Sequence, residues 1–568
     1  MIEFSNRMKN VSASAVREIL KLMADPNIIS FGGGSPAKEA FPLLAIKEIT
    51  EEILNNNSYA ALQYGITEGY VPLREAYLKH IAHPKGVVAG VDNVLIVTGA
   101  TQGINLAIDV LLNPGDVVLV ESPTFLTTLM VLNKYEVKCV EVKTDDQGMI
   151  IADLEDKIKK YNPKMLYSVP TFQNPTGKTL PLDRRKKLAS LASENNMFVI
   201  EDDPYCDLRY KGEALPPIKH FDKTGHVIFI NSFSKIISPG LRVGSVIAEK
   251  EIIDKMTISK QCSDTHTSNL SQIICYEFLN KGLLRDHLNK INSLYRERME
   301  TMLDCIDLYF PKGTKYTKPE GGLFIWVQLL GNVDINELLK LATKECNVAF
   351  VPGSPFFVSS HDGNKSLRLN FSSNTPETIK IGMKKLGDAI HNNIRIELVT
   401  PNDYKEIYEF EKNNKVFFEK VLPPRPLGYE NYDSFKKIVD SLLVEQSCGD
   451  YYMYIIRNYE NKIVGRINLQ MIINDGIRKA EVGYRIDFKD QGKGIISNAI
   501  KFILSEAFNK YDVIEVLAGT SKENIASQRV LEKNGFIKIG DHKDVFEVNG
   551  EMLYGFLYSK FRHERGSI

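Results

Sequence analysis

Apolar and polar positions follow a repeating block pattern between about residue 90 and residue 250. Short apolar runs rich in β-branched residues alternate with segments of helical periodicity, which predicts a mostly parallel sheet with helices on both faces. Such sheets bind ligands outside the carboxyl ends of their strands. The expected strands are NVLIV (93–97), DVVLV (116–120), KMLYSV (164–169), MFVI (197–200), HVIFI (226–230) and VGSVIA (243–248).

The pattern changes twice further along the chain. Helices are expected from residue 269, followed by a smaller α+β part that contains GGLFIWVQL and SLRLNFS and ends near residue 390. At HNNIRIELVTPND the pattern restarts, with IRIELV as a new first strand and a helix after Pro401-Asn402-Asp403. We therefore predict an α/β domain over residues 1–392 and a second, α+β domain over residues 393–568.

Composition excludes several classes of protein. A chain of 568 residues is too long for one hydrophobic core. Its 71 basic and 71 acidic side chains cancel, so no charge points to nucleic acid or to an anionic membrane. Seven cysteines without a CxxC pair indicate free thiols, and the ten histidines show no metal-site spacing. With no membrane-length apolar run and a charged start, MIEFSNRMKN, we expect a cytoplasmic protein without metal.

Polar residues stand where several of the predicted strands end. GATQG (99–103) opens a helix, and its free N–H groups suit a phosphate, although a tight turn with a helix cap explains it equally well. FQNPTG (172–177) is by itself an ordinary turn sequence. In MFVIEDDPY a predicted buried strand is followed by three consecutive acidic residues. In FINSFSK the strand is followed by hydroxyl residues and a lysine. These ends lie at the binding edge of a parallel sheet.

Taken together in this order, NPTG, DDPY, SFSK and the following arginine resemble the aspartate-aminotransferase-like superfamily of pyridoxal-phosphate enzymes. The similarity is to its 2-aminoadipate and kynurenine aminotransferase group and covers about residues 4–390. It implies the PLP-dependent transferase fold: a mostly parallel sheet of the seven-stranded type, helices on both faces and a small α+β domain. It also implies pyridoxal 5′-phosphate as cofactor, and an amino acid and a 2-oxo acid as substrates. Since the chain begins at this segment, we expect no DNA-binding helical domain in front of it.

The resemblance assigns the lysine of SFSK a covalent bond to the cofactor. Lys235 would also carry the proton that leaves the substrate Cα, and enclosure near cationic groups would lower its pKa enough for it to react as a neutral amine. Pro239 and Gly240 would shape the turn that brings an arginine back to the cofactor phosphate. The implied phosphate-binding residues are Ala100, Thr101, Ser232, Ser234 and Arg242.

An acid at the end of MFVIEDDPY would hold the cofactor's ring nitrogen. Strand geometry alone does not choose among Glu201, Asp202 and Asp203, but the family spacing before Tyr205 selects Asp202. A carboxylate there keeps the ring nitrogen protonated and makes the ring an electron sink. The family also implies that Asn174 and Tyr205 hydrogen-bond the phenolic oxygen of the ring.

Four further positions come from the family pattern. Phe125 matches the aromatic residue that stacks on the ring, with a core phenylalanine as the alternative. Arg368 matches the arginine that binds the substrate α-carboxylate through a bidentate fork, and Gly34 lies where bare backbone approaches the substrate. Tyr64 matches the tyrosine that reaches the phosphate of the neighbouring subunit, which implies a homodimer.

A second set of motifs lies in KAEVGYRIDFKDQGKGIISNAIKFILSEAF (479–508) and TSKENIASQRVLEKNGFIKIG (520–540). A strand leads into QGKGIIS, whose glycines would expose N–H groups at a helix start to a pyrophosphate. Over about residues 394–560 the chain resembles the GNAT acyl-CoA N-acyltransferases, in particular those that acetylate ribosomal-protein N-termini. This resemblance implies acetyl-CoA as cosubstrate.

The GNAT resemblance also implies individual contacts. Ser527 would donate to the leaving sulfur, and Glu481 would take the amine proton unless it is a solvent-facing strand residue. Ile496 departs from the family, which usually has Gly or Ala there. The implied acetyl-CoA contacts are Gln491, Gly492, Lys493, Gly494, Asn524 and Ser527.

These motifs predict a bifunctional enzyme that transaminates amino acids and acetylates an amine. A PLP-dependent lyase or decarboxylase is the alternative within the superfamily, with the GNAT domain then serving as a regulatory acyl-CoA-binding module. Arg368 favours transamination, because an α-carboxylate that is held is protected from loss. A regulatory or scaffold protein is the alternative of another class.

Overall fold

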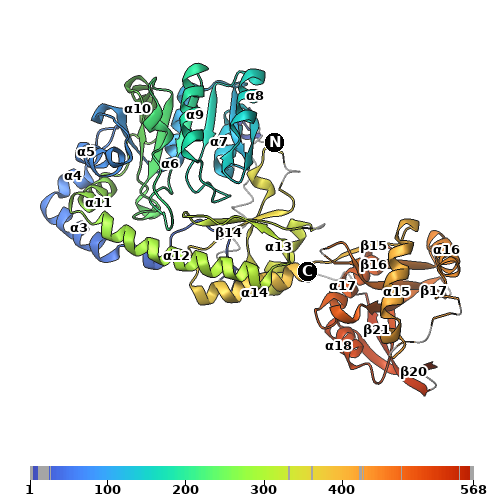
Figure 1. The fold of residues 1–568 in the computed structure, drawn as a ribbon. Coiled ribbons are helices and arrows are strands. Elements are labelled where there is room, and N and C mark those ends of the chain that lie inside the picture. The colour runs from blue at the N-terminus through green and yellow to red at the C-terminus, as the bar shows by residue number, and fades with distance from the viewer. Residues whose placement is uncertain are drawn as a thin grey trace. The chain divides into compact units, whose positions relative to one another are not determined.

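The computed structural model describes residues 4–9, 25, 27–330, 333–359, 363–420, 422, 425–426, 428–458, 460–474, 476–548 and 551–562. It forms two compact units, residues 1–387 and 388–568 (Figure 1), which are described separately. The division falls inside helix α14 (Pro376–His391), whereas the boundary predicted at residue 393 follows the end of this helix.

The first unit is built on a mostly parallel sheet with the order β2-β9-β8-β7-β6-β3-β4-β5. β9 runs antiparallel to both of its neighbours, and β5 is a two-residue strand that pairs antiparallel with β4. The seven longer strands confirm the predicted fold class, although β4 was not among the predicted strands. The strands are β2 (Val94–Val97), β3 (Val117–Ser122), β4 (Lys138–Asp145), β5 (Gly148–Met149), β6 (Met165–Ser168), β7 (Phe198–Asp202), β8 (Val227–Ser232) and β9 (Gly244–Ile247).

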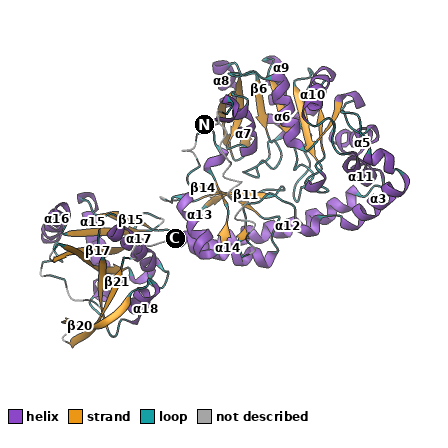
Figure 2. Cartoon of the chain, turned by 180° about the vertical axis from the view of Figure 1, so that it is seen from behind, coloured by secondary structure: helices purple, strands orange, loops and turns teal. Residues whose placement is uncertain are grey.

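Helices cover both faces of this sheet (Figure 2). Leu166 and Val199 face one way and belong to the core that α8 and α9 close. α6 lies on the other face, where Gly103 stands against Ile230 and Val246. The helices around the sheet are α3 (Leu43–Asn56), α4 (Ser58–Leu62), α5 (Val71–Tyr77), α6 (Ala100–Leu111), α7 (Leu126–Lys134), α8 (Ile151–Tyr161), α9 (Leu182–Glu194), α10 (Lys250–Ser263) and α11 (Asn269–Asn280).

A smaller α+β part completes the first unit, as predicted. Its antiparallel sheet has the order β10-β11-β14-β13, and Arg368 on β14 pairs with Trp326 on β11 and Val351 on β13. A two-stranded parallel sheet joins β1 to β12. The elements are β1 (Ile29–Ser30), α12 (Leu284–Tyr309), β10 (Lys315–Tyr316), β11 (Phe324–Gln328), α13 (Ile335–Cys346), β12 (Val348–Ala349), β13 (Val351–Pro352), β14 (Ser366–Asn370) and α14. A four-residue helix, α1 (Asn6–Lys9), lies near the start of the chain.

The second unit is α+β, with a sheet of order β15-β16-β17-β18-β19-β21-β20. Its neighbouring strands are antiparallel except β18 and β19, which are parallel. The predicted first strand IRIELV and the helix after Asp403 are both present. The strands are β15 (Arg395–Leu398), β16 (Tyr451–Arg457), β17 (Ile463–Asn474), β18 (Ile477–Ile486), β19 (Glu515–Ser521), β20 (Ile537–Val548) and β21 (Glu551–Phe561).

Alternate residues of β16 face two separate apolar cores. Tyr454 and Ile456 pack with α17, whereas Met453 and Ile455 pack with α15 and α16. This alternation places helices on both faces of the sheet. The helices are α15 (Tyr404–Phe418), α16 (Tyr432–Cys448), α17 (Ile495–Asn509) and α18 (Ile525–Lys533). Among the described residues, no helix combines the length and the apolar character that a membrane crossing needs.

Candidate active sites

Lys235 lies directly after β8, in the loop that leads to the 3₁₀ turn Pro239–Leu241. Its Nζ donates a hydrogen bond of 2.7 Å to the carbonyl oxygen of Gly34. Burial, helped by the positive charges of Arg242 and Arg368, lowers the pKa of Lys235 to about 8. Roughly a tenth of this amine is therefore neutral at pH 7, far more than for an ordinary lysine, and the neutral form is the one that a nucleophile or a general base requires.

The predicted phosphate-binding residues gather at the start of α6. Arg242 has a left-handed backbone (φ 55°), and its Nη2 donates to the carbonyl oxygen of Thr98 over 3.2 Å. A Cβ on Gly99 would come within 2.4 Å of this Nη2, so the guanidinium lies directly against the helix start at Ala100. Such a helix start combines free N–H groups with a positive dipole end. The helix start and Arg242 together suit a dianionic phosphate.

The two predicted serines stand at the end of β8, on the strand that leads to Lys235. Ser232 is the last residue of β8, and its Oγ accepts a hydrogen bond of 3.1 Å from the N–H of Ser234. Both residues are buried. They give this loop a fixed shape with hydroxyl groups close to the lysine.

The structure separates the three acids at the end of β7. Both carboxylate oxygens of Glu201 accept backbone N–H bonds, from Ile218 (2.7 Å) and from Lys219 (2.8 Å). Asp202 Oδ2 accepts from the Tyr167 hydroxyl at 2.7 Å, whereas its Oδ1 is buried and has no partner among the described residues. Burial raises the pKa of Asp202 to about 7. A buried carboxylate oxygen without a donor fits a protonated ring nitrogen.

Asp203 faces other groups. Burial raises the pKa of its carboxyl group, while the charges of Lys85 and Arg185 act in the opposite direction. Burial and then the charge of Asp202 raise the pKa of Tyr205, whereas Arg368 lowers it. Asp202 is therefore the acid that interacts with Tyr205. The environment of the three acids therefore agrees with the choice of Asp202.

Arg368 presents its guanidinium group to the residues expected around a substrate. Its Nη1 donates to Asn174 Oδ1 (2.9 Å) and its Nη2 to the carbonyl oxygen of Gly32 (2.6 Å). The group stacks over the ring of Phe324 at 4.3 Å. Asn174 Nδ2 in turn donates to the Tyr205 hydroxyl over 3.4 Å. Among the described residues Arg368 thus bonds only to neutral groups, and an incoming carboxylate would add a charged partner.

Two further predicted residues come from α7 and from the segment after α4. Phe125 is half-buried at the N-terminal end of α7, and its stacking role stays a prediction. Tyr64 is 82% exposed and makes an edge-to-face contact with His266, with ring centroids 5.8 Å apart. Other large apolar side chains of residues 43–71 are exposed as well. They are Leu43, Leu44, Leu54, Tyr59, Leu62, Ile66 and Val71.

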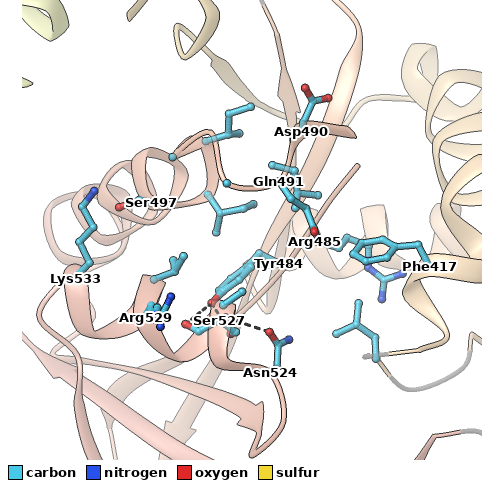
Figure 3. Close-up of a pocket in the computed structure, with 18 of the residues that line it drawn as sticks. Phe417, Tyr484, Arg485, Asp490, Gln491, Ser497, Asn524, Ser527, Arg529 and Lys533 are labelled. Carbon is cyan, nitrogen blue, oxygen red and sulfur yellow. Dashed lines mark hydrogen bonds between the residues drawn. The ribbon is translucent and has the colours of Figure 1, made fainter. Parts of the chain in front are cut away.

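In the second unit, a pocket of about 580 Å³ lies beside the diverging strands β18 and β19 (Figure 3). These strands pair only from Lys479 with Glu515 to Glu481 with Leu517. β18 then continues beside β17 to Ile486, and its residues from Tyr484 onward line the pocket. The divergence of a parallel pair therefore opens the sheet for a ligand.

The predicted glycine loop forms one wall of the pocket at the start of α17. Gly492 (φ 71°) and Gly494 (φ 80°) have left-handed backbones, and no described heavy atom lies within 4 Å of a Cβ built on either. Their bare backbone leaves the helix start open to an anion. Gln491 also lines the pocket, but Lys493 does not: its Nζ pairs with Asp490 at 2.7 Å.

The middle of the pocket holds a hydroxyl pair. Ser527 Oγ and the Tyr484 hydroxyl are 2.7 Å apart, and burial raises the pKa of Tyr484 to about 12. Asn524 caps α18, with its Oδ1 accepting from the N–H of Ser527 at 3.1 Å. Glu481 is not among the residues that line this pocket, and its role as a base stays a prediction.

The family model for aminotransferase class I and II matches residues 26–386, which is more than half of the chain. The chain belongs to this family. The model for an acetyltransferase (GNAT) domain matches residues 393–537. The first unit is thus an aminotransferase unit and the second a GNAT unit, as the sequence motifs predicted.

Relatives of the aminotransferase unit are known from several organisms. The chain is 39% identical to the aromatic-amino-acid aminotransferase 1 of Thermococcus litoralis, over 69% of this chain and 95% of that protein. It is 38% identical to the 2-aminoadipate transaminase of Thermus thermophilus, over 68% of this chain and 96% of that protein. A solved kynurenine aminotransferase of Pyrococcus horikoshii has a TM-score of 0.66 at 41% identity, covering 68% of this chain and 96% of that one.

The cofactor of this aminotransferase family is pyridoxal phosphate, and the residues present fit it. The unpaired Asp202 Oδ1 suits its ring nitrogen, the Arg242 and α6 cradle suits its phosphate, and the partly neutral Lys235 suits its aldehyde. Clusters of three or more His, Cys, Asp or Glu side chains suited to a metal ion are absent from the described part of the chain.

Sequence reasoning missed several residues of the GNAT pocket. Tyr484 stood in the quoted run KAEVGYRID, where an aromatic residue just before the phosphate loop was a usable signal. Arg529 and Lys533 line the pocket from α18, and Phe417 and Phe418 line it from α15. The α15 residues lie far away in sequence, so only the fold reveals their role.

Proposed function

We propose that this chain is a bifunctional enzyme: a PLP-dependent aminotransferase joined to an acetyl-CoA-dependent N-acetyltransferase. The observation that carries the first activity is the placement of Lys235 beside Arg242 and Arg368, together with the unpaired oxygen of Asp202. A reactive amine, a phosphate site, a ring-nitrogen partner and a carboxylate site are four separate requirements of transamination, and this unit meets each of them.

Each residue of the aminotransferase unit then has a defined task. Bound pyridoxal phosphate supplies an aldehyde carbon and an electron-withdrawing ring. Lys235 Nζ accepts the proton from the substrate Cα, since its lowered pKa of about 8 makes the free amine available. Asp202 holds the ring nitrogen in its protonated form. Arg368 binds the α-carboxylate and keeps it from leaving, which favours transamination over decarboxylation.

The relatives suggest which amino donors to examine first. They are named for aromatic amino acids, 2-aminoadipate and kynurenine. All seven cysteines are free thiols, which supports a place in the reducing cytoplasm. The exposed apolar side chains of residues 43–71, Tyr64 among them, support a homodimer, because exposed apolar groups of this number are typical of a surface that a partner covers.

In the GNAT unit the pocket supports acetyl transfer. The pyrophosphate of acetyl-CoA would bind the loop at Gly492 and Gly494, and its acyl end would reach Tyr484 and Ser527. The amine nitrogen attacks the acetyl carbon, the C–N bond forms as the C–S bond breaks, and the amine loses a proton to water. The leaving sulfur takes a proton from the Ser527–Tyr484 pair, which is protonated because the pKa of Tyr484 is raised to about 12.

Two measurements on the full chain test this function. The purified protein should absorb visible light through its bound cofactor, and that absorbance should change when an amino acid from the panel is added. In a separate assay, acetyl-CoA and a set of amines should release free CoA thiol. A protein that binds pyridoxal phosphate but releases CO₂ without making a 2-oxo acid would contradict the first activity. Binding of acetyl-CoA without acetylation of any amine would contradict the second.

A further inference from the structure

Four charged side chains from separate parts of the GNAT unit meet beside its pocket. Glu411 Oε1 accepts from Arg466 Nη1 (2.6 Å) and Arg425 Nη2 (2.6 Å). Its Oε2 accepts from Arg425 Nε (3.2 Å) and Arg485 Nη1 (2.9 Å). Glu411 lies on α15, Arg466 on β17 and Arg485 on β18. The fold therefore gathers three guanidinium groups around one carboxylate.

The charges of this cluster do not balance. Burial opposes ionisation of Glu411, but the three arginines lower the pKa of Glu411 to about 2, so it carries one negative charge. Among the described residues, no other acidic side chain bonds to these arginines. Burial and the like charges of Arg425 and Arg466 lower the pKa of Arg485 to about 10, which still leaves it protonated. An excess of positive charge in a buried place is costly unless an anion joins it.

Arg485 is the member of the cluster that lines the pocket. Its side chain is 14% exposed, and its guanidinium group lies over the ring of Phe418 at 4.8 Å. Only its Nη1 has a hydrogen-bond partner among the described residues. Figure 3 shows Arg485 with Phe417 at the end of the pocket opposite Ser497 and Lys533, with the Tyr484–Ser527 pair between the two ends. Two donor nitrogens of Arg485 are thus available at this end of the pocket, where Figure 3 also draws Gln491.

We infer that the acetyl acceptor is a free amino acid and that Arg485 binds its α-carboxylate. The inference rests on the acetyltransferase activity proposed above and names its acceptor. In an amino acid the amine and the carboxylate are separated by one carbon atom, so one small molecule places both groups. A protein N-terminus has a peptide carbonyl in place of this carboxylate and would leave the positive charge unmatched.

The strand geometry agrees with this placement. Tyr484 and Arg485 are neighbours on β18, so their side chains leave the strand on opposite sides, yet both line the pocket. The pocket therefore reaches around the open edge of β18. The thioester would lie on the Tyr484 side and the carboxylate on the Arg485 side, which brings the amine to the point between them. The amino acids handled by the first unit belong to the same chemical class.

The first arm of the test compares acceptors on the full chain. The acceptors are the common protein amino acids, their α-amides and a peptide with a free N-terminus, each with acetyl-CoA. For the best amino acid, kcat/KM should exceed that of its α-amide by roughly tenfold or more, since a charge-assisted pair is lost in the amide. Equal rates for acid and amide, or acetylation of the peptide alone, would overturn the inference.

The second arm uses variants of the arginine. Arg485→Gln should raise KM for the amino acid roughly 10- to 100-fold, leave kcat nearly unchanged and leave the kinetics of the α-amide as they are. Arg485→Lys keeps the charge and should recover part of the loss. Arg478→Gln, an exposed arginine at the other end of β18, is the matched control. If Arg485→Gln slows acid and amide equally, the arginine is structural and the inference fails.

A binding measurement separates this inference from the proposed acetyltransferase activity. Calorimetry with an N-acetyl amino acid and with its amide, in the presence of CoA, needs no turnover. The acid should bind the unaltered chain at least tenfold more tightly than the amide, and Arg485→Gln should abolish this difference. A chain that shows this preference but acetylates nothing would refute the activity alone. A chain that acetylates amines without this preference would refute the role of Arg485 alone.

Discussion

Lys235 Nζ donates to the carbonyl oxygen of Gly34 at 2.7 Å, across a sequence separation of 201 residues. This bond joins the loop after β8 to the N-terminal segment of the chain. A Cβ on Gly34 would come within 3.1 Å of the Phe324 ring, the same ring that stacks on Arg368. Lys235 and Arg368 are thus linked through one short piece of backbone, so an amino acid held by Arg368, as proposed, would present its Cα to Lys235.

Replacing Lys235 with Ala should abolish the visible absorbance of bound cofactor and lower transamination with every amino acid by roughly 10³-fold or more, since both nucleophile and base are lost. Lys223→Ala, a change at an exposed lysine, is the control and should behave like the unaltered chain. A Lys235→Ala protein that still converts amino donors to 2-oxo acids would refute the assignment.

The pKa of Lys235 gives this site a characteristic pH dependence. Cofactor capture by the cofactor-free protein needs the neutral amine, whose fraction rises about tenfold per pH unit below the pKa. With a pKa of about 8, the capture rate should climb up to that pH and then level off. Stopped-flow absorbance at several pH values measures it. A rate that keeps rising through pH ~10 would indicate a lysine with its ordinary pKa.

Asp202→Asn should separate activity from stability. Removing the charge that holds the ring nitrogen should lower kcat by roughly 10²-fold or more. In the cofactor-free protein the folded-state pKa of Asp202 is raised from 3.8 to about 7, so its contribution to stability is present below the unfolded value and lost as pH rises toward 7. The variant should therefore gain melting temperature relative to the unaltered chain over this range. A difference that does not change with pH would contradict the raised pKa.

Tyr64 should act across the interface of a dimer. A mixture of inactive Lys235→Ala chains and weakly active Tyr64→Ala chains should regain activity, because one site of each mixed dimer then has an intact lysine and an intact tyrosine. Tyr554→Ala, a change at an exposed tyrosine of the GNAT unit, replaces Tyr64→Ala in the control mixture. Analytical ultracentrifugation gives the oligomeric state. A chain that is fully active as a monomer would rule out the shared site.

The sequence was sufficient where short local patterns determine structure. The strand ends at Asn174, Asp202 and Lys235 each follow an apolar run, and parallel strands bring such ends together. Strand β4, KCVEVKTD, was missed because its alternating charges and half-buried positions do not resemble a buried strand. The Glu411 cluster could not have been predicted, since its arginines come from three distant positions and the fold alone brings them together.

Larger side chains in the glycine loop of the GNAT unit should weaken the binding of acetyl-CoA. Gly494 has φ 80°, a backbone that L-residues adopt at a cost of roughly 1–2 kcal/mol, more for a β-branched residue. Gly494→Val should reorient the loop and weaken acetyl-CoA binding roughly tenfold or more by calorimetry. Gly540→Val, a change at an open glycine on β20, is the control and should keep the affinity. Unchanged affinity in Gly494→Val would mean that the pyrophosphate binds elsewhere.

The two activities should be coupled through the amino acid itself. The equilibrium constant of transamination is close to one, and acetylation removes the amine that the reverse reaction needs. Acetylation by the second unit would therefore shift the transamination equilibrium toward its amino acid product. Linking two sites in one chain also raises the effective concentration of each near the other.

The full chain, given an amino donor, a set of 2-oxo acids and acetyl-CoA, should form N-acetyl amino acids, detected by mass spectrometry. Chains carrying Lys235→Ala should form them only from amino acids supplied directly, and chains carrying Arg485→Gln should accumulate the free amino acid. If the full chain acetylates no transamination product while it readily acetylates peptides, the two activities are not linked in this way.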